Sequence, residues 1–193
     1  AGSVVSDMND NPHGKGYGLH IDRGKVHVNL TSVWVDDAIR VESEETLAAK
    51  RWYHVAATYD GSKVADHIHI YVDGRPVKSK VLMDTLYRPY RNARRKFDVP
   101  VRIGGGWGPE RRFHGLISAV HLYSAVLTAD EIAALANADS LSTLAAKKPV
   151  ARTPLESKIL RWAFLETSAP PRYRETWTQL VAARAEKEKF ERT

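Results

Sequence analysis

Aliphatic and polar residues alternate over short stretches throughout the first two thirds of the chain. Residues 17–22 and 25–30 each place aliphatic side chains on one face and polar side chains on the other. The dipeptide Arg23-Gly24 between them has the length and the glycine of a two-residue hairpin turn. This turn sets His20 opposite His27, so the sequence predicts an antiparallel hairpin.

Further stretches repeat this period of two and are bounded by turn residues. They lie at 52–61, 67–74, 99–106 and 114–124, and Asp-Gly pairs end the first two. Short strands with regular turn signals are typical of antiparallel sandwiches and barrels. Regular alternation of apolar and polar residues indicates sheets with one buried face and one solvated face. We therefore expect a mostly β protein built as an antiparallel β-sandwich.

Two histidines that lie two positions apart raise the question of a metal site. In 67–72 the isoleucines and the valine share one face, which leaves His67 and His69 on the other. A closed metal site needs three or four ligands, and no acidic or cysteine partner recurs at a short spacing. We predict imidazoles on the solvated sheet face, with a metal-binding pair as the alternative. The same prediction applies to His20, His27 and His121.

After residue 125 the period becomes helical. Thr128 is followed three residues later by Glu131, and Thr153 by Glu156, which are the spacings of capping boxes at helix N-termini. A third helical pattern runs through 172–192 and becomes mostly charged toward its end. The sequence thus predicts helices after the sandwich.

Composition limits the chemistry that the chain can perform. Cysteine is absent from the 193 residues, which excludes disulfides, thiolate metal sites, cysteine nucleophiles and covalently attached haem within this chain. No apolar run approaches the length that crosses a bilayer. The sequence shows neither an initiator methionine nor a signal peptide, so we expect a piece of a longer protein.

The formal net charge of +6 is unevenly distributed. Basic residues gather at 88–96 and 111–112 and again from Lys147 onward. Such clusters suit nucleic acids or anionic surfaces, but the aromatic and basic interleaving of nucleic-acid reader modules is missing. We expect no nucleic-acid partner.

Five pieces of the sequence, in their order and spacing, resemble the laminin-G-like jelly roll of the concanavalin A-like lectin/glucanase superfamily. They are WYHVAATYDG at 52–61, IYVDG at 70–74, IGG at 103–105, the F-x-G-x-I strand at 113–123 and LTADEIAAL at 127–135. The resemblance implies a concanavalin A-like jelly roll with a C-terminal α-helical extension.

With WVDDAIRV at 34–41, the sequence also resembles the variant of this domain embedded in large planctomycete proteins that carry a c-type cytochrome region. On this resemblance the tail looks like the start of a following domain, and haem belongs only to other parts of a parent protein. The implied organisation is a jelly roll at 1–140, a linker at 141–152 and a helical segment at 153–193.

The chain departs from the family at its beginning, because the one or two strands that usually precede the piece matching SVVSDM are missing. An incomplete sandwich exposes unpaired strand edges. We therefore expect other segments or chains of the same parent protein to complete the sandwich and to pack on the helical tail.

No catalytic constellation is recognisable. Glucanases of the superfamily use a Glu-x-Asp-x-x-Glu strand, whereas Glu42 and Glu44 share a strand face at a different spacing. The nucleophile elbow G-x-S-x-G is missing, and the glycine-rich stretch 103–108 lacks the lysine of a phosphate loop. We expect this chain to carry no catalytic residue, with a glycan-active enzyme as a distant alternative.

A calcium site is one cofactor that the sequence leaves open. Residues 7–11 resemble the start of an EF-hand loop, but Pro12 replaces its glycine and Gly18 its final glutamate. A looser calcium site and a solvated turn remain the two interpretations. The candidate ligands are Asp7, Asn9 and Asp10.

Loop aromatics beside charged residues are the candidates for ligand binding, because sugars stack on aromatic rings and hydrogen-bond to Asp and Arg. They are Trp34, Asp36, Asp37, Tyr90, Trp107, Arg111 and Arg112. In the alternative interpretation the two tryptophans close the ends of the sandwich.

Together these observations predict a non-catalytic, lectin-like binding or docking module of a larger exported protein. We expect a periplasmic or secreted location, with polysaccharide as the ligand. The alternative is a structural spacer that packs against neighbouring domains.

Overall fold

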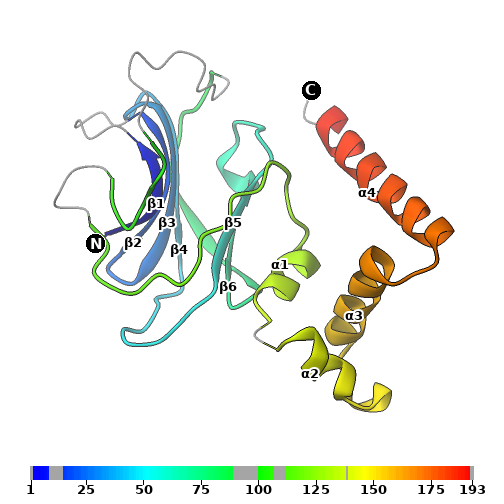
Figure 1. Cartoon of the computed structure of the whole chain (residues 1–193). Coiled ribbons are helices and arrows are strands. Elements are labelled where there is room, and N and C mark those ends of the chain that lie inside the picture. The colour runs from blue at the N-terminus through cyan, green and yellow to red at the C-terminus, as the bar shows by residue number, and fades with distance from the viewer. Residues whose placement is uncertain (1, 9–14, 89–99, 107–111, 138, 192–193) are drawn as a thin grey trace. The chain divides into compact units, whose positions relative to one another are not determined.

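The computed structural model describes residues 2–8, 15–88, 100–106, 112–137 and 139–191 (Figure 1). The chain forms two compact units. The first contains Ala1–Val72 and Pro76–Val126, and the second contains Asp73–Arg75 and Leu127–Thr193. The first unit is built of strands and the second mainly of helices.

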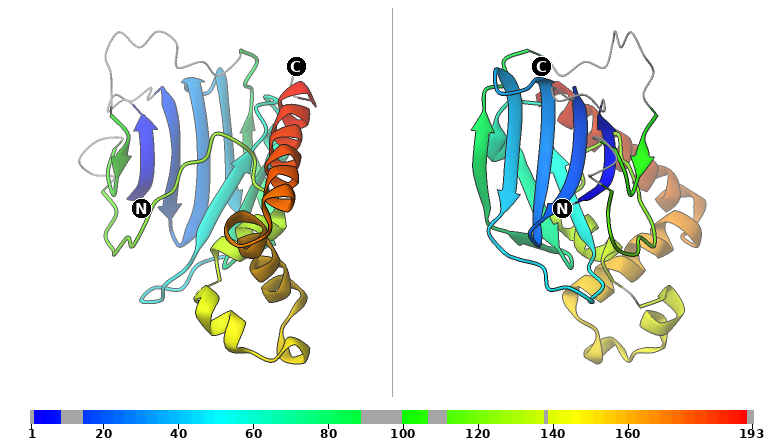
Figure 2. Two further views of the ribbon diagram at one scale, coloured as in Figure 1. Left: turned by 45° about the vertical axis from the view of Figure 1, so that its right-hand side comes forward. Right: turned by 90° about the vertical axis from the view of Figure 1, so that its left-hand side faces the viewer.

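The first unit contains two antiparallel sheets (Figures 1 and 2). The larger sheet has six strands in the order β8-β4-β3-β2-β1-β9. Their bounds are β1 (Gly2–Met8), β2 (Gly16–Asp22), β3 (Lys25–Val33), β4 (Asp37–Ser43), β8 (Ser79–Asp84) and β9 (Arg102–Ile103). The smaller sheet contains β5 (Val55–Tyr59), β6 (Ile68–Val72) and β7 (Arg75–Val77), and η1 (Ala65–His67) precedes β6. The two sheets and the helices that follow confirm the predicted jelly-roll sandwich with a helical extension.

The β2–β3 hairpin forms as the sequence predicts. Arg23 and Gly24 both have positive φ angles, 49° and 77°, the backbone geometry whose twist matches that of the flanking strands. Their turn sets the register, in which His20 faces His27. The local sequence therefore suffices for this hairpin.

The hydrophobic core lies between the two sheets. Its buried members are Val26, Leu30, Ile39, Val41, Ala65, Ile68, Ile70, Val72 and Leu86. The aliphatic face predicted for 68–72 is thus the inward face of β6, while His69 is exposed on the other side. His67 lies in η1 rather than in the strand, and its Nδ1 contacts the Asp60 carboxylate at 2.7 Å.

The predicted exposure of the histidines is wrong for His20 and His27, which are only 5% and 4% exposed. Both face away from the core, as alternation requires. Their side chains are nevertheless shielded, because each lies in a closely spaced cross-strand row with Ser3 and Glu42. The polar face of this sheet is therefore largely dry.

Two predicted strands differ in the structure. Of the stretch 99–106, the described residues 100–106 contain only the two-residue strand β9, and 114–124 contains no strand. The alternating pattern at 114–124 is suitable for a strand, but a strand also requires a neighbouring edge with which to pair. Among the described residues no such pairing is present.

The second unit contains four α-helices in its described residues. They are α1 (Ala129–Leu135), α2 (Leu141–Ala146), α3 (Pro154–Thr167) and α4 (Pro171–Glu191), and η3 (Pro149–Ala151) follows α2. Both predicted capping boxes are present, at Thr128 and at Thr153. None of the described helices is long and apolar enough to cross a membrane.

The segment 141–152, which we predicted as a linker, contains the helices α2 and η3. Ser140 caps α2, and the Arg152 guanidinium donates to the carbonyls of Leu144 and Ala145 at 3.2 and 2.8 Å. Lys147 forms ion pairs with Asp139 and Glu156. These contacts join residues seven to nine positions apart, so composition alone did not reveal them.

Candidate functional site

The turn between β3 and β4, with the first residue of β4, contains three of the predicted binding residues, Trp34, Asp36 and Asp37. Trp34 is half-buried in this turn, and Asp36 is exposed. Val35 between them has a φ angle of 73°, a left-handed conformation that is rare for a β-branched residue. Such a conformation persists only where surrounding contacts hold the backbone in place.

Those contacts come from the chain that follows β8. The Asp37 carboxylate is fully buried, and its Oδ1 accepts hydrogen bonds from the backbone N–H groups of Tyr87 and Arg88 at 3.0 and 3.4 Å. The Thr85 hydroxyl donates to the Val35 carbonyl at 2.8 Å. Residues fifty positions apart in the sequence are thereby held together.

Tyr87 and Arg88 form the exposed part of this arrangement. The Tyr87 side chain is 59% exposed, and the Arg88 guanidinium lies over its ring, 5.0 Å from the centroid. The same guanidinium donates to the Tyr87 hydroxyl at 2.5 Å and lies 3.5 Å from Asp37 Oδ2. We name Trp34, Asp36, Asp37, Tyr87 and Arg88 the turn cluster.

The structure brings together some of the predicted binding residues and separates others. Trp34, Asp36 and Asp37 lie in the turn cluster, but Asp37 is an internal anchor rather than a surface group. Arg112 is exposed beside β1, where it forms a bridge with Ser3. The predicted residues Tyr90, Trp107 and Arg111 lie outside the described residues.

Sequence reasoning did not place Tyr87 and Arg88 in the site. Their nearest signal in the sequence is the start of the basic run at 88–96, which is typical of many solvated loops. Only the hydrogen bonds to Asp37 reveal that these two residues belong with Trp34.

A second polar group covers the face of the six-stranded sheet that points away from the core. Its first cross-strand row is Ser3, His20, His27, Glu42 and Lys80. Its second row is Ser6, Gly18, Asn29 and Arg40. We name these residues the polar rows.

Gly18 leaves room for the His20 imidazole in the polar rows. A Cβ atom on Gly18 would lie 2.5 Å from Nε2 of His20, so the imidazole occupies the space that a larger residue would fill. The chain after β9 closes the β1 end in a similar manner, because the Ser6 hydroxyl donates to the Gly105 carbonyl at 3.2 Å. The rows are therefore packed rather than solvated.

Charges in the polar rows are paired around His27. Lys25 donates to Glu42 at 2.9 Å, and the other Glu42 oxygen lies 3.6 Å from Nε2 of His27. Burial, reinforced by the nearby Arg40 guanidinium, lowers the pKa of His27, and Glu42 opposes this only in part. The hydrogen bond from Lys25 lowers the pKa of Glu42. At neutral pH the row thus contains a neutral imidazole beside an ionised carboxylate.

Several polar atoms in and beside these rows lack hydrogen-bond partners within the part of the chain that is described. They include the Ser3 hydroxyl, the Asn29 carbonyl oxygen and the Thr31 hydroxyl. These side chains are at most 1% exposed, so a ligand reaches them only if this face opens. The exposed turn cluster is the more accessible site.

The described residues do not bring a set of candidate metal ligands together. No group of three or more His, Cys, Asp or Glu side chains there could hold a metal ion. Of the calcium candidates, Asp7 is buried in β1, whereas Asn9 and Asp10 lie outside the described residues. Of the pair Glu42 and Glu44, the Glu42 carboxylate is hydrogen-bonded by Lys25, whereas Glu44 is exposed.

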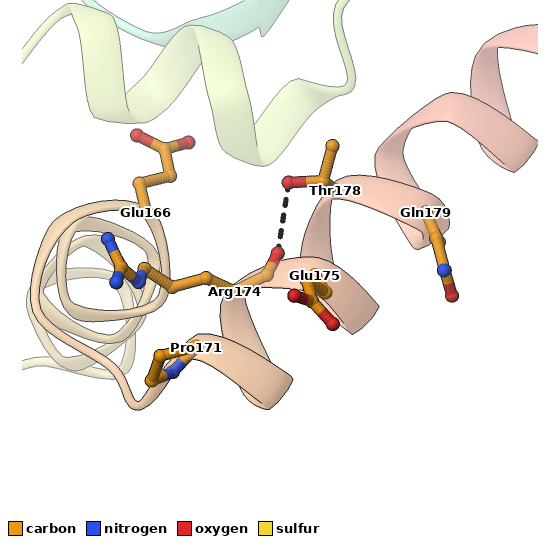
Figure 3. Close-up of a pocket in the computed structure, with 6 residues that line it drawn as sticks. All are labelled: Glu166, Pro171, Arg174, Glu175, Thr178 and Gln179. Atoms are coloured by element: carbon orange, nitrogen blue, oxygen red, sulfur yellow. Dashed lines mark hydrogen bonds between the residues drawn. The ribbon is translucent and has the colours of Figure 1, made fainter.

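In the second unit, a surface depression of about 510 Å³ lies between the end of α3 and the first turns of α4 (Figure 3). It is lined by Glu166, Pro171, Arg174, Glu175, Thr178 and Gln179. All six side chains are exposed, and the Thr178 hydroxyl donates to the Arg174 carbonyl of its own helix. Mixed charges on an open surface do not make a ligand site.

The comparison with protein families agrees with the fold. Residues 1–133 match the family described as the concanavalin A-like lectin/glucanases superfamily. No curated protein sequence matches the chain. The chain is also similar to a solved structure of residues 221–444 of an S-layer domain-containing protein from Clostridium thermocellum, with 21% identity and a TM-score of 0.32. That similarity covers 70% of this chain and 64% of the other, so the chain spans less than two thirds of that structure.

Proposed function

We propose that this chain, which belongs to the concanavalin A-like lectin/glucanase superfamily, is a non-catalytic module that binds polysaccharide through the turn cluster. Membership of this superfamily supports a carbohydrate-binding or a structural module. The finer proposal depends on one observation: the exposed Tyr87 ring, with the Arg88 guanidinium over it, lies on a chain segment that hydrogen bonds join to the turn containing Trp34 and Asp36.

The chemistry of the turn cluster suits a sugar. An aromatic ring packs against the C–H face of a pyranose, while a carboxylate and a guanidinium hydrogen-bond to its hydroxyl groups. Binding is strengthened when the contacting groups are already in place, because less conformational entropy is lost on association. Asp37 and Thr85 provide that preorganisation here.

The setting of the module is part of the same proposal. We infer a larger exported protein, periplasmic or secreted, of which this chain is one module. Calcium binding at Asp7, Asn9 and Asp10 stays a prediction, as does the kinship with planctomycete proteins that carry cytochrome c regions.

A structural spacer is the second candidate, and the second unit supplies the observation that favours it. Helix α4 leaves Tyr173, Leu180 and Val181 between 42% and 48% exposed, on one side of the helix. A spacer that packs on neighbouring domains through this helix needs no sugar site. The glycan-active enzyme remains a distant third candidate, since Glu42 is already bound by Lys25.

Affinity electrophoresis of the 193-residue chain in gels that contain a panel of neutral and acidic polysaccharides tests the proposal. At least one polysaccharide should retard the chain, and Trp34→Ala or Tyr87→Ala should weaken that binding at least tenfold. Trp52→Ala is the matched control, because Trp52 is 61% exposed but lies outside the turn cluster. Trp107→Ala tests the other tryptophan predicted from the sequence.

The outcomes separate the candidates. Retardation that survives both Trp34→Ala and Tyr87→Ala removes the turn cluster as the site. Passage through every gel without retardation favours the spacer. Release of reducing sugar from any polysaccharide, lost on Glu42→Gln, would revive the enzyme.

A further inference from the structure

Three contacts hold the Arg88 guanidinium in place within the turn cluster. It lies over the Tyr87 ring, 5.0 Å from the ring centroid, and its Nη2 donates to the Tyr87 hydroxyl at 2.5 Å. Its Nε lies 3.5 Å from Oδ2 of the fully buried Asp37. The backbone beneath is fixed as well, because the N–H groups of Tyr87 and Arg88 both donate to Asp37 Oδ1. The guanidinium therefore loses little rotamer freedom when it binds a ligand.

Most N–H donors of this guanidinium remain available to a ligand. A guanidinium carries its N–H groups in one rigid plane and has no acceptor. In the described part of the chain, the bond to the Tyr87 hydroxyl is the only hydrogen bond found for the Arg88 side chain. The Asp37 contact is an ion pair through Nε, which leaves the N–H groups of Nη1 without an acceptor. The Arg88 side chain is 59% exposed, so a ligand can reach these donors.

The free donors of Arg88 match a carboxylate better than a hydroxyl group. A carboxylate accepts two parallel N–H bonds from one guanidinium, and such charge-assisted bonds are about twice as strong as bonds between neutral groups. A sugar hydroxyl offers one oxygen and no charge, so it uses only part of what a guanidinium provides. The geometry at Arg88 therefore favours an acidic sugar over a neutral one.

The charge of the neighbouring sequence favours the same class of ligand. The ten residues that follow Arg88 contain four basic residues and one acidic residue, within a chain of net charge +6. These ten residues lie outside the described part of the chain and are no part of the site, but their charge attracts an anionic polymer. Asp36 opposes this attraction, because it adds an exposed carboxylate to the turn cluster.

We propose that the turn cluster binds an acidic polysaccharide, in which Arg88 holds the carboxylate of a uronic acid residue. This inference rests on the proposed function and adds the class of ligand to it. Tyr87 is 59% exposed although the guanidinium lies over its ring, so ring surface remains for a pyranose. A polymer can occupy both positions, because one sugar packs on the ring while its neighbour meets the guanidinium. The Tyr87 hydroxyl positions the guanidinium.

Biolayer interferometry with end-biotinylated polymers tests this inference on the 193-residue chain. Polygalacturonate is compared with its methyl ester, and alginate with its propylene glycol ester, so that each pair shares a backbone and differs in free carboxylates. At least one acidic polymer should bind, and its ester should bind at least about tenfold more weakly. Salt at about 0.15 M suppresses the general attraction between the basic chain and the polymers.

Variants of Arg88 separate a directed contact from general charge attraction. Arg88→Gln should weaken binding of the acidic polymer about tenfold or more. Arg88→Lys keeps the charge but loses the planar fork, so it should weaken binding as well. The matched control is Arg161→Gln, which removes the same charge from an exposed position in α3 and should change the affinity less than about twofold. Far-ultraviolet circular dichroism checks that each variant is folded.

Two further variants leave Arg88 itself intact. Tyr87→Phe keeps the ring but removes the hydroxyl that orients the guanidinium, so it should weaken binding of polygalacturonate more than binding of the methyl ester. Asp36→Asn keeps an oxygen that can accept a hydrogen bond and removes the opposing charge. It should therefore strengthen binding of the acidic polymers and leave binding of the esters unchanged.

The outcomes distinguish this inference from the proposed function. Equal binding of acid and ester, still lost in Tyr87→Ala, would keep the sugar site and overturn the acidic ligand. Full binding by Arg88→Lys would reduce the effect to charge attraction, and so would dextran sulfate bound equally by the parent chain and by Arg88→Gln; either result overturns the carboxylate contact. Failure to bind any polymer, neutral or acidic, would remove the proposed function and this inference with it.

Discussion

The carboxylate of Asp37 accepts a hydrogen bond from the backbone N–H of Tyr87 at 3.0 Å, although the two residues lie fifty positions apart. This contact joins the first residue of β4 to the chain that follows β8. It joins the turn that contains Trp34 to the chain segment that contains Tyr87, and we name this junction the corner. The buried Asp37 carboxylate therefore holds the corner in place and does not itself contact a ligand.

Removal of this carboxylate should destabilise the first unit and disorganise the corner. Asp37→Ala leaves two backbone N–H groups without their acceptor, at a cost of about 1–3 kcal/mol in the free energy of unfolding. Asp36→Ala, on an exposed neighbour, should stay within about 0.5 kcal/mol of the parent chain. Urea unfolding followed by circular dichroism measures both, and equal effects would show that Asp37 is not the anchor.

The buried His27 should make stability depend on pH in a defined direction. Its pKa is lowered in the folded chain, chiefly by burial, so the unfolded chain takes up a proton first as the pH falls below about 6.5. Stability should therefore decrease from about pH 6.5 downward and level off below the folded pKa. Urea midpoints measured between pH 7.5 and 5 record this decrease.

Replacement of His27 assigns that pH dependence. His27→Gln should reduce the loss of stability between pH 7.5 and 5, whereas His69→Gln, on an exposed strand position, should leave it unchanged. A decrease that is identical in the parent chain and in His27→Gln would place the responsible group elsewhere.

The core of the sandwich should be sensitive to the loss of volume at β6. Ile70 is fully buried between the sheets, so Ile70→Ala should cost about 2–5 kcal/mol through lost burial and the cavity that remains. Leu82 on β8 is 38% exposed, and Leu82→Ala should cost less than about 1.5 kcal/mol. Urea unfolding of both variants should reproduce this order, and a reversed order would mean that the core lies elsewhere.

The N-terminus of α3 should respond to the loss of its capping box. The Thr153 hydroxyl accepts from Glu156 N–H at 3.2 Å, and Thr153→Ala should cost about 1 kcal/mol. Thr178→Ala is the control, since Thr178 is exposed within α4. Thermal unfolding by circular dichroism at 222 nm compares them, and equal melting temperatures would argue against a stabilising cap.

The same helix end should lose stability in acid. The hydrogen bond from Lys147, aided by that from Thr153 N–H, lowers the pKa of Glu156. A lowered carboxyl pKa stabilises the folded state above about pH 4.3, and this stabilisation is lost as the pH falls through the folded pKa. Glu156→Gln should therefore flatten the acid limb of the stability curve, and an unchanged limb would contradict this assignment.

The sequence by itself determined the features that depend on neighbours along the chain. The β2–β3 hairpin follows from a two-residue turn with glycine, and both capping boxes follow from a spacing of three. The inward face of β6 follows from simple alternation. Each of these features depends on backbone geometry within a few residues, so the residue pattern is sufficient.

Only the tertiary structure decided features that depend on distant partners. Trp34 and Asp36 were predicted as binding residues, but Tyr87 and Arg88 join them solely through hydrogen bonds across fifty positions. Alternation placed His20 and His27 away from the core, yet burial depended on their cross-strand neighbours. Residues 114–124 have the pattern of a strand but lack an edge, because pairing requires a second segment that the local sequence does not specify.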